Sequence, residues 1–156
     1  MKTIYVECKP DFTLVRTITK IPKKHIIHAG GKSEICRKLE KQQNCTGLID
    51  EDPLSIRPPY IEKMEIVDNL LQHELKVLYD TSRGNYLVVL RPRLEEWILK
   101  AAQEASTDVR KYGLPDDAGK LHQEINANLD KFERLIENLK DSGRLKTLKK
   151  LLEKRK

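Results

Sequence analysis

Short apolar runs alternate with amphipathic stretches over the first 53 residues. Residues 3–7, 25–28 and 45–49 are short and rich in apolar, often β-branched side chains, which predicts buried strands. Between them, apolar residues recur at helical spacing from Pro10 to Thr19 and again after Ser33, which can cap a second helix. Parallel strands need helical crossovers, so this order predicts an α/β fold with a central, mostly parallel sheet flanked by helices.

The apolar pattern is looser after residue 53, where prolines 58 and 59 predict a loop. The predicted elements beyond that loop are strand-like pieces within 65–79, best at Lys76–Tyr79, a strand at Tyr86–Leu90, and helices over 93–104, 121–140 and from Arg144 to the end. We therefore divide the chain into an α/β domain over 1–104 and a helical extension with a basic tail over 105–156.

Composition indicates a highly charged chain with a core of its own. Of the 156 residues, 35% are charged and 38% are hydrophobic. No apolar run approaches the roughly 20 residues that cross a bilayer, and the first residues do not resemble a signal peptide. The three cysteines show no CxxC spacing, which predicts neither a disulfide framework nor a zinc site. We expect a cytoplasmic protein with no membrane partner.

The net charge of +6 is carried by the last 17 residues, which hold eight Lys or Arg and two Asp or Glu. Leucines in the same segment recur at helical spacing. Two interpretations stay open: an amphipathic helix that docks on the chain or on a partner, including self-association, and an arm that binds nucleic-acid phosphates. The residues assigned to phosphate contact are Lys146, Lys149, Lys150, Lys154 and Arg155.

Acidic residues follow two of the predicted parallel strands. Glu7 ends the first strand, and Asp50 and Asp52 follow the third. Ligands of open α/β sheets bind beyond the carboxyl ends of the strands, so these side chains are expected at one edge. Clustered carboxylates favour Mg²⁺, which can engage a phosphate oxygen. The alternative for the two aspartates is a solvated turn.

The same segments resemble the two motifs of Toprim domains. VECKPD (Val6–Asp11) is similar to the motif in which an apolar strand ends in Glu with an Asp four residues later, and GLIDEDP (Gly47–Pro53) is similar to the strand that ends in DxD. The resemblance covers residues 3–53. It implies the Rossmann-like Toprim fold, Glu7 in acid–base chemistry or metal binding, and Asp50 and Asp52 as ligands of Mg²⁺ or Mn²⁺.

A third stretch, LRPRLEEWI (Leu90–Ile98), is similar to a segment of the small OLD-nuclease-like Toprim proteins with an acid two residues before a Trp. This resemblance implies Glu95 as a further metal ligand. The alternative is that Glu95 is a surface acid and Trp97 a core anchor. The chain departs from the family in having Cys8 where a Gly usually follows the Glu.

These features predict a Mg²⁺-dependent nuclease or related phosphoryl-transfer enzyme acting on DNA or RNA, with Glu7 as its catalytic acid/base. Two alternatives stay open: a catalytically inactive Toprim-like subunit that binds nucleic acid or regulates a partner, and a phosphatase of nucleotides. In OLD nucleases the Toprim part is fused to an ATPase, and no P-loop occurs here, so an ATPase partner is one implied possibility. Gly30–Ser33 is either a βα turn or a phosphate site at a helix amino terminus.

Overall fold

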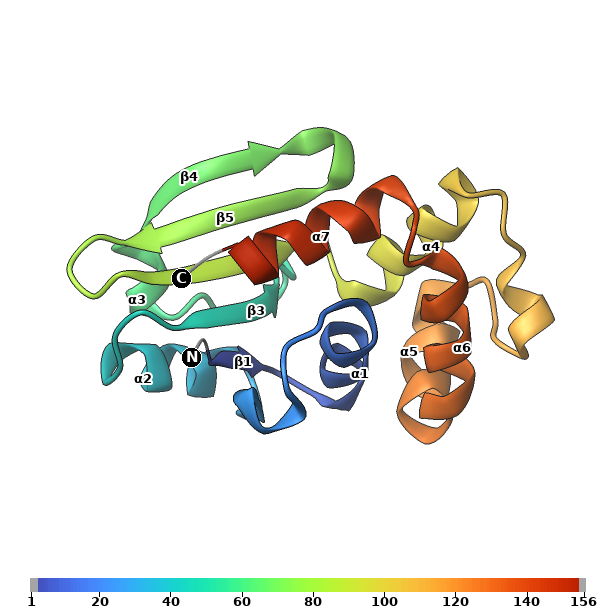
Figure 1. Ribbon diagram of the computed structural model, residues 1–156, viewed down its shortest axis with the longest axis horizontal. Coiled ribbons are helices and arrows are strands. Elements are labelled where there is room, and N and C mark those ends of the chain that lie inside the picture. The colour runs from blue at the N-terminus through green and yellow to red at the C-terminus, as the bar shows by residue number, and fades with distance from the viewer. Residues whose placement is uncertain (1–2, 155–156) are drawn as a thin grey trace.

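A six-stranded sheet forms the centre of the chain in the computed structural model, which describes residues 3–154 and, at Lys154, the backbone alone. The strand order across the sheet is β2-β1-β3-β6-β5-β4 (Figure 1). The strands are β1 Ile4–Val6, β2 Ile26–His28, β3 Thr46–Asp50, β4 Glu65–Leu70, β5 Leu75–Asp80 and β6 Asn85–Leu90.

Strands β2, β1, β3 and β6 pair in parallel, while β5 and β4 follow as antiparallel neighbours. Val6 pairs with Leu48, and Asp50 pairs with Leu90, so the carboxyl ends of three strands share one edge. The predicted α/β class is confirmed, with a sheet that is mixed because of the β4–β5 hairpin.

Strand β4 shows why the sequence signal was weak between residues 65 and 79. It lies at the edge of the sheet, and its register against β5 shifts between Ile66 and Asp68. Ile66 is 61% exposed and Val67 is 45% exposed. A strand exposed on both sides has no alternating pattern for a periodicity argument to detect.

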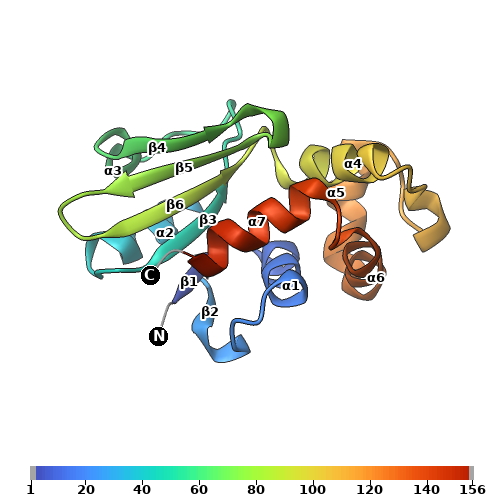
Figure 2. The same cartoon turned by 45° about the horizontal axis from the view of Figure 1, so that its top comes forward.

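Helices cover the two faces of the sheet unequally (Figure 2). One face packs against α1 and α7, and α4, α5 and α6 extend this layer past the carboxyl edge. Among residues 3–154, the opposite face is covered by α2 and the one-turn α3 alone. The helices are α1 Lys9–Ile18, α2 Lys32–Glu40, α3 Pro59–Glu62, α4 Leu94–Glu104, α5 Ala118–Ala127, α6 Leu129–Leu139 and α7 Gly143–Lys154.

Three local predictions about helices are corrected. The helix expected over 121–140 is two helices, because Asn128 leaves the helical conformation (φ −135°, ψ 59°). Helix α2 begins after Gly31, so Ser33 lies inside its first turn and does not cap it. The predicted loop after residue 53 contains α3, because Pro59 occupies a first helical position, where its missing N–H costs little.

Helix α7 completes the core on the α1 face. Its leucines are buried among residues of the sheet, α1, α4 and α6, so both predicted parts of the chain contribute to one hydrophobic core. The docked-helix interpretation of the leucines is confirmed, and covering them needs no second copy. The division at residue 104 stays a prediction. The buried leucines of α7 are Leu145, Leu148, Leu151 and Leu152.

A buried cation anchors the start of α7. Arg144 is 2% exposed, and it forms ion pairs with Glu74 at 2.9 Å and Glu104 at 2.8 Å. Its guanidinium carbon lies 5.9 Å from the ring centre of Trp97, which is fully buried as the core-anchor interpretation expected. These contacts connect α7 to α4 and to the β4–β5 hairpin.

The described helices contain none that is both long and apolar enough to cross a bilayer.

Candidate functional site

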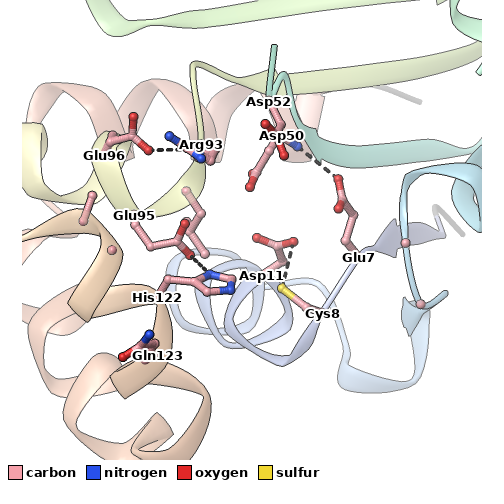
Figure 3. Close-up of a pocket in the computed structure, with 15 residues that line it drawn as sticks. Glu7, Cys8, Asp11, Asp50, Asp52, Arg93, Glu95, Glu96, His122 and Gln123 are labelled. Atoms are coloured by element: carbon pink, nitrogen blue, oxygen red, sulfur yellow. Dashed lines mark hydrogen bonds and ion pairs between the residues drawn. The ribbon is translucent and has the colours of Figure 1, made fainter. Parts of the chain in front are cut away.

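Two predicted acids meet at the carboxyl edge of the sheet. Glu7 follows β1, and Asp50 is the last residue of β3, which lies beside β1. The backbone N–H of Asp50 donates to Glu7 Oε1 at 3.1 Å. The parallel pairing of the two strands therefore holds both carboxylates at one place (Figure 3).

Asp11 joins them from the first turn of α1. It is 2% exposed, and its Oδ2 accepts a hydrogen bond from the Cys8 thiol at 3.3 Å. The other oxygen, Oδ1, is buried without a hydrogen-bond partner, as is Oδ1 of Asp50. Buried polar atoms are nearly always paired, so two unpaired carboxylate oxygens in one place require an explanation.

Burial dominates the electrostatics of this cluster. It raises the pKa of Asp50 to about 7, and the neighbouring charge of Glu7 adds to the rise. Burial also raises the pKa of Asp11 well above its usual range, with Asp50 and Glu7 as further causes. The pKa of Glu7 is raised mainly by burial, although the charge of Lys32 opposes this. The three carboxyl groups cannot all ionise at low cost without an added cation.

Asp52 reaches the same pocket by a different route from the one expected. The sequence argument placed it on an extended strand end two residues after Asp50, but Asp52 has a left-handed backbone (φ 37°). Its N–H donates to Pro92 O at 2.8 Å, and its Oδ1 accepts from Leu54 N at 3.3 Å. It is half-buried and lines the pocket from this turn.

Glu95 enters the pocket from the start of α4. It is 7% exposed, so the surface-acid interpretation is wrong. Its Oε2 lies 3.3 Å from Nδ1 of His122, which comes from α5. Beside it, Arg93 forms an ion pair with Glu96 at 2.7 Å. Figure 3 shows Glu95 and His122 across the pocket from Glu7.

The pocket has a volume of about 490 Å³, and the acids that line it include all four predicted ligands: Glu7, Asp50, Asp52 and Glu95. Within residues 3–154, however, no three His, Cys, Asp or Glu side chains are arranged so that they could hold one ion together. Mg²⁺ usually takes one or two carboxylates and keeps several waters. The candidate ligands here are carboxylate oxygens, and two of them, Oδ1 of Asp11 and Oδ1 of Asp50, have no partner. They fit an Mg²⁺ or Mn²⁺ ion that takes one or two carboxylates and keeps its waters.

The basic residues of the tail lie on a helix that leads away from this pocket. Glu153, near the end of α7, accepts a hydrogen bond from Lys20 N at 2.9 Å, and Lys20 follows α1, which begins beside the pocket and ends at the opposite edge. Of the residues assigned to phosphate contact, Arg155 and the side chain of Lys154 lie outside the described residues. The others lie on α7, with two exposed and one half-buried: Lys146, Lys150 and Lys149.

Sequence reasoning did not assign Asp11 or His122 to the site. Asp11 was named from the sequence only as the last residue of the Toprim-like motif. Its position four residues after Glu7, at the start of a helix that follows the strand, was the available signal. His122 had no comparable signal, since only the tertiary packing of α5 against α4 brings it to Glu95.

The Cys8 departure from the Toprim pattern does not strain the backbone. Cys8 has an extended conformation (φ −148°), which any residue adopts. Burial raises the pKa of its thiol, so it stays protonated and can donate to Asp11. Cys8 therefore fills space beside the carboxylates that a Gly would leave open.

No family model, curated protein or solved structure matches this chain.

Proposed function

We propose that the chain is a Mg²⁺- or Mn²⁺-dependent phosphodiester hydrolase that acts on nucleic acid, with a Toprim-like site. One observation carries the proposal. Asp11 and Asp50 each bury a carboxylate oxygen without a partner, beside Glu7 and in a pocket of about 490 Å³. An uncompensated cluster of buried carboxylates costs stability, and a divalent cation removes that cost and brings Lewis acidity to a phosphate oxygen.

Asp50 and Asp52 are the residues proposed to hold the ion, with Asp11 next to them. Bound there, the ion supplies charge stabilisation to a phosphate. Glu95 stays a proposed further ligand, although one of its oxygens already contacts His122. The donor set contains carboxylates alone, which suits hard cations more than zinc.

Glu7 is proposed as the general base. Its raised pKa, caused mainly by burial, brings it closer to neutral pH, where a base is most effective. The N–H of Asp50 fixes one of its oxygens and leaves the other to accept a proton. In the reaction, the oxygen of a water molecule bonds to phosphorus and its proton passes to Glu7. The bond from phosphorus to the leaving oxygen breaks, and that oxygen takes a proton from solvent.

A second candidate function is an inactive Toprim-like subunit that binds nucleic acid or regulates a partner. The observation that favours it is Cys8, whose thiol engages Asp11 and occupies space next to the cluster. In that case the carboxylates would bind a cation without cleavage.

Cleavage assays separate the two candidates. Plasmid, single-stranded DNA and RNA are incubated with the protein in Mg²⁺, Mn²⁺ or EDTA, beside the variants Glu7→Gln and Glu137→Gln. Glu137 is an exposed acid of α6 that pairs with Lys140, so it serves as a matched control. We expect metal-dependent cleavage by wild type and the control only. Cleavage that survives in Glu7→Gln would exclude Glu7 as the base, and no cleavage by wild type would favour the inactive subunit.

A further inference from the structure

A second hollow, of about 260 Å³, opens on the other face of the sheet beyond Asp52. This is the face on which the described helices are α2 and the single turn of α3. The floor of the hollow is apolar and comes from three neighbouring strands and α3, namely Ile49, Val89, Leu78 and Ile61. An apolar floor of this size fits a flat, weakly polar group such as a nucleobase.

The rim of the hollow carries three cations. Lys76 is held by Glu51 at 3.1 Å and is nearly buried. Arg57 pairs with Glu62 at 3.3 Å, but its side chain is 54% exposed, so the pair is weak and can exchange for a phosphate.

The third cation, Lys32, has hydrogen bonds but no ion pair. Its Nζ donates to Glu51 O and to Ser55 Oγ, both at 2.9 Å. No carboxylate of the described residues lies within ion-pair distance of it. Its charge acts on Glu7 and Asp50 without a direct ion pair to either, and an anion that enters between the two hollows would lie next to it.

A third hollow, of about 470 Å³, connects the carboxylate pocket to the basic rim. It shares Glu7, Asp50 and Asp52 with the first, and Asp52, Lys32 and Ser55 with the second. At Gly31 an added Cβ would have no heavy atom within 4 Å, so the backbone is open to an incoming chain. Because neighbouring hollows share these lining residues, the three lie next to one another and make up a track from the carboxylate pocket to the basic rim.

From this track we infer that the second hollow binds the base and phosphate of the nucleotide next to the scissile phosphate, and that the substrate is single-stranded nucleic acid. The inference rests on the proposed function. A base in a duplex is stacked and paired, so moving it into a pocket breaks both interactions, whereas a single strand has no pairing to lose. Leu54 and Ile56, each 89% exposed on the loop beside the track, offer apolar contact to such a base.

Binding is tested apart from cleavage. Fluorescence anisotropy in EDTA measures the affinity of wild type for a labelled 12-nucleotide single strand of DNA or RNA and for the same DNA as a duplex. Unlabelled adenosine monophosphate is then added as a competitor of the single strand. We expect the single strands to bind about tenfold more tightly than the duplex. Equal affinity for the duplex, or competition by the mononucleotide as effective as that of the 12-mer, would overturn the inference.

Two variants locate the binding. Arg57→Ala and Ile56→Ser should each weaken single-strand binding about three- to tenfold, since each removes one contact to phosphate or base. The controls are Arg110→Ala and Leu71→Ser, whose side chains are comparably exposed and lie away from the track. Variants that bind as the controls do would refute the pocket. If Arg57→Ala and Ile56→Ser weaken binding as expected but wild type does not cleave nucleic acid in Mg²⁺, the proposed reaction is refuted and the binding pocket stands.

Discussion

Replacing Asp50 by Asn should stabilise the protein at neutral and alkaline pH. The pKa of Asp50 is about 7 in the folded chain against an ordinary value of 3.8, mainly because the group is buried and Glu7 is near. Each pKa unit corresponds to about 1.4 kcal/mol, so ionised Asp50 costs the folded state roughly 4 kcal/mol. Local rearrangement and water reduce such penalties, and we expect a gain of about 2–4 kcal/mol.

The gain should depend on pH in a defined direction. The folded chain keeps a proton on Asp50 up to about pH 7, whereas the unfolded chain releases it near pH 4. The contribution of Asp50 to wild-type stability therefore falls as pH rises between these values and is level above them. Asn has no proton to lose, so the advantage of Asp50→Asn should be absent near pH 4 and complete above pH 7.

Thermal and urea denaturation at pH 5 and pH 8, both in EDTA, measure this difference. A gain of 2 kcal/mol corresponds to a rise in Tm of at least about 4 °C in a chain of this size. The exposed Asp116, changed to Asn, is the control and should shift Tm little at either pH. If Asp50→Asn were less stable than wild type at pH 8, the carboxylate would be compensated within the chain, and the argument for a cation would fail.

Three other changes give distinct expectations. Asp52→Asn should change the free energy of unfolding in EDTA by less than about 0.5 kcal/mol, because the residue is a half-buried turn acid. The same change should remove most of the rise in Tm that Mg²⁺ causes in wild type. An unchanged rise in a thermal shift assay would exclude Asp52 as a ligand. Arg144→Met should lower the unfolding free energy by about 2 kcal/mol in urea titrations, through loss of its two charge-assisted ion pairs; an unchanged midpoint would contradict this. The triple variant Lys146→Gln, Lys149→Gln and Lys150→Gln removes three tail charges. It should reduce the slope of log affinity for nucleic acid against log salt concentration by about one per lost phosphate contact. A slope equal to that of wild type would exclude the tail as the phosphate arm.

Much of the parallel half of the fold was predictable from the sequence because its central strands are buried on both faces, whereas β2 at the edge buries Ile26 but exposes Ile27 and His28. Residues of β1 and β3 are almost all buried, so they form short apolar runs, and α1 has one apolar face. The edge strand β4 and the break at Asn128 depend on neighbours that lie far away in sequence. Local patterns do not contain that information.

The candidate site divides in the same way. Glu7 and Asp50 were predicted to lie together because the carboxyl ends of parallel strands meet at one edge of a sheet. The parallel pairing of β1 with β3 places both residues at that edge. The burial of Asp11 and the approach of His122 to Glu95 depend on how α1, α4 and α5 pack. The asymmetric covering of the sheet, which opens the second hollow, also has no local signature.

Trp97 gives this protein an optical reporter where α4, α7 and the β4–β5 hairpin meet. It is the single tryptophan of the chain, its ring is fully buried, and its indole N–H donates to His73 O at 2.8 Å. The Arg144 guanidinium lies beside the ring, and Glu95 is two residues away on the same helix. Its emission should therefore shift to longer wavelength when α7 leaves the sheet. A comparison of the unfolding curves from tryptophan emission and from circular dichroism on the same sample would reveal whether α7 detaches before the strands separate.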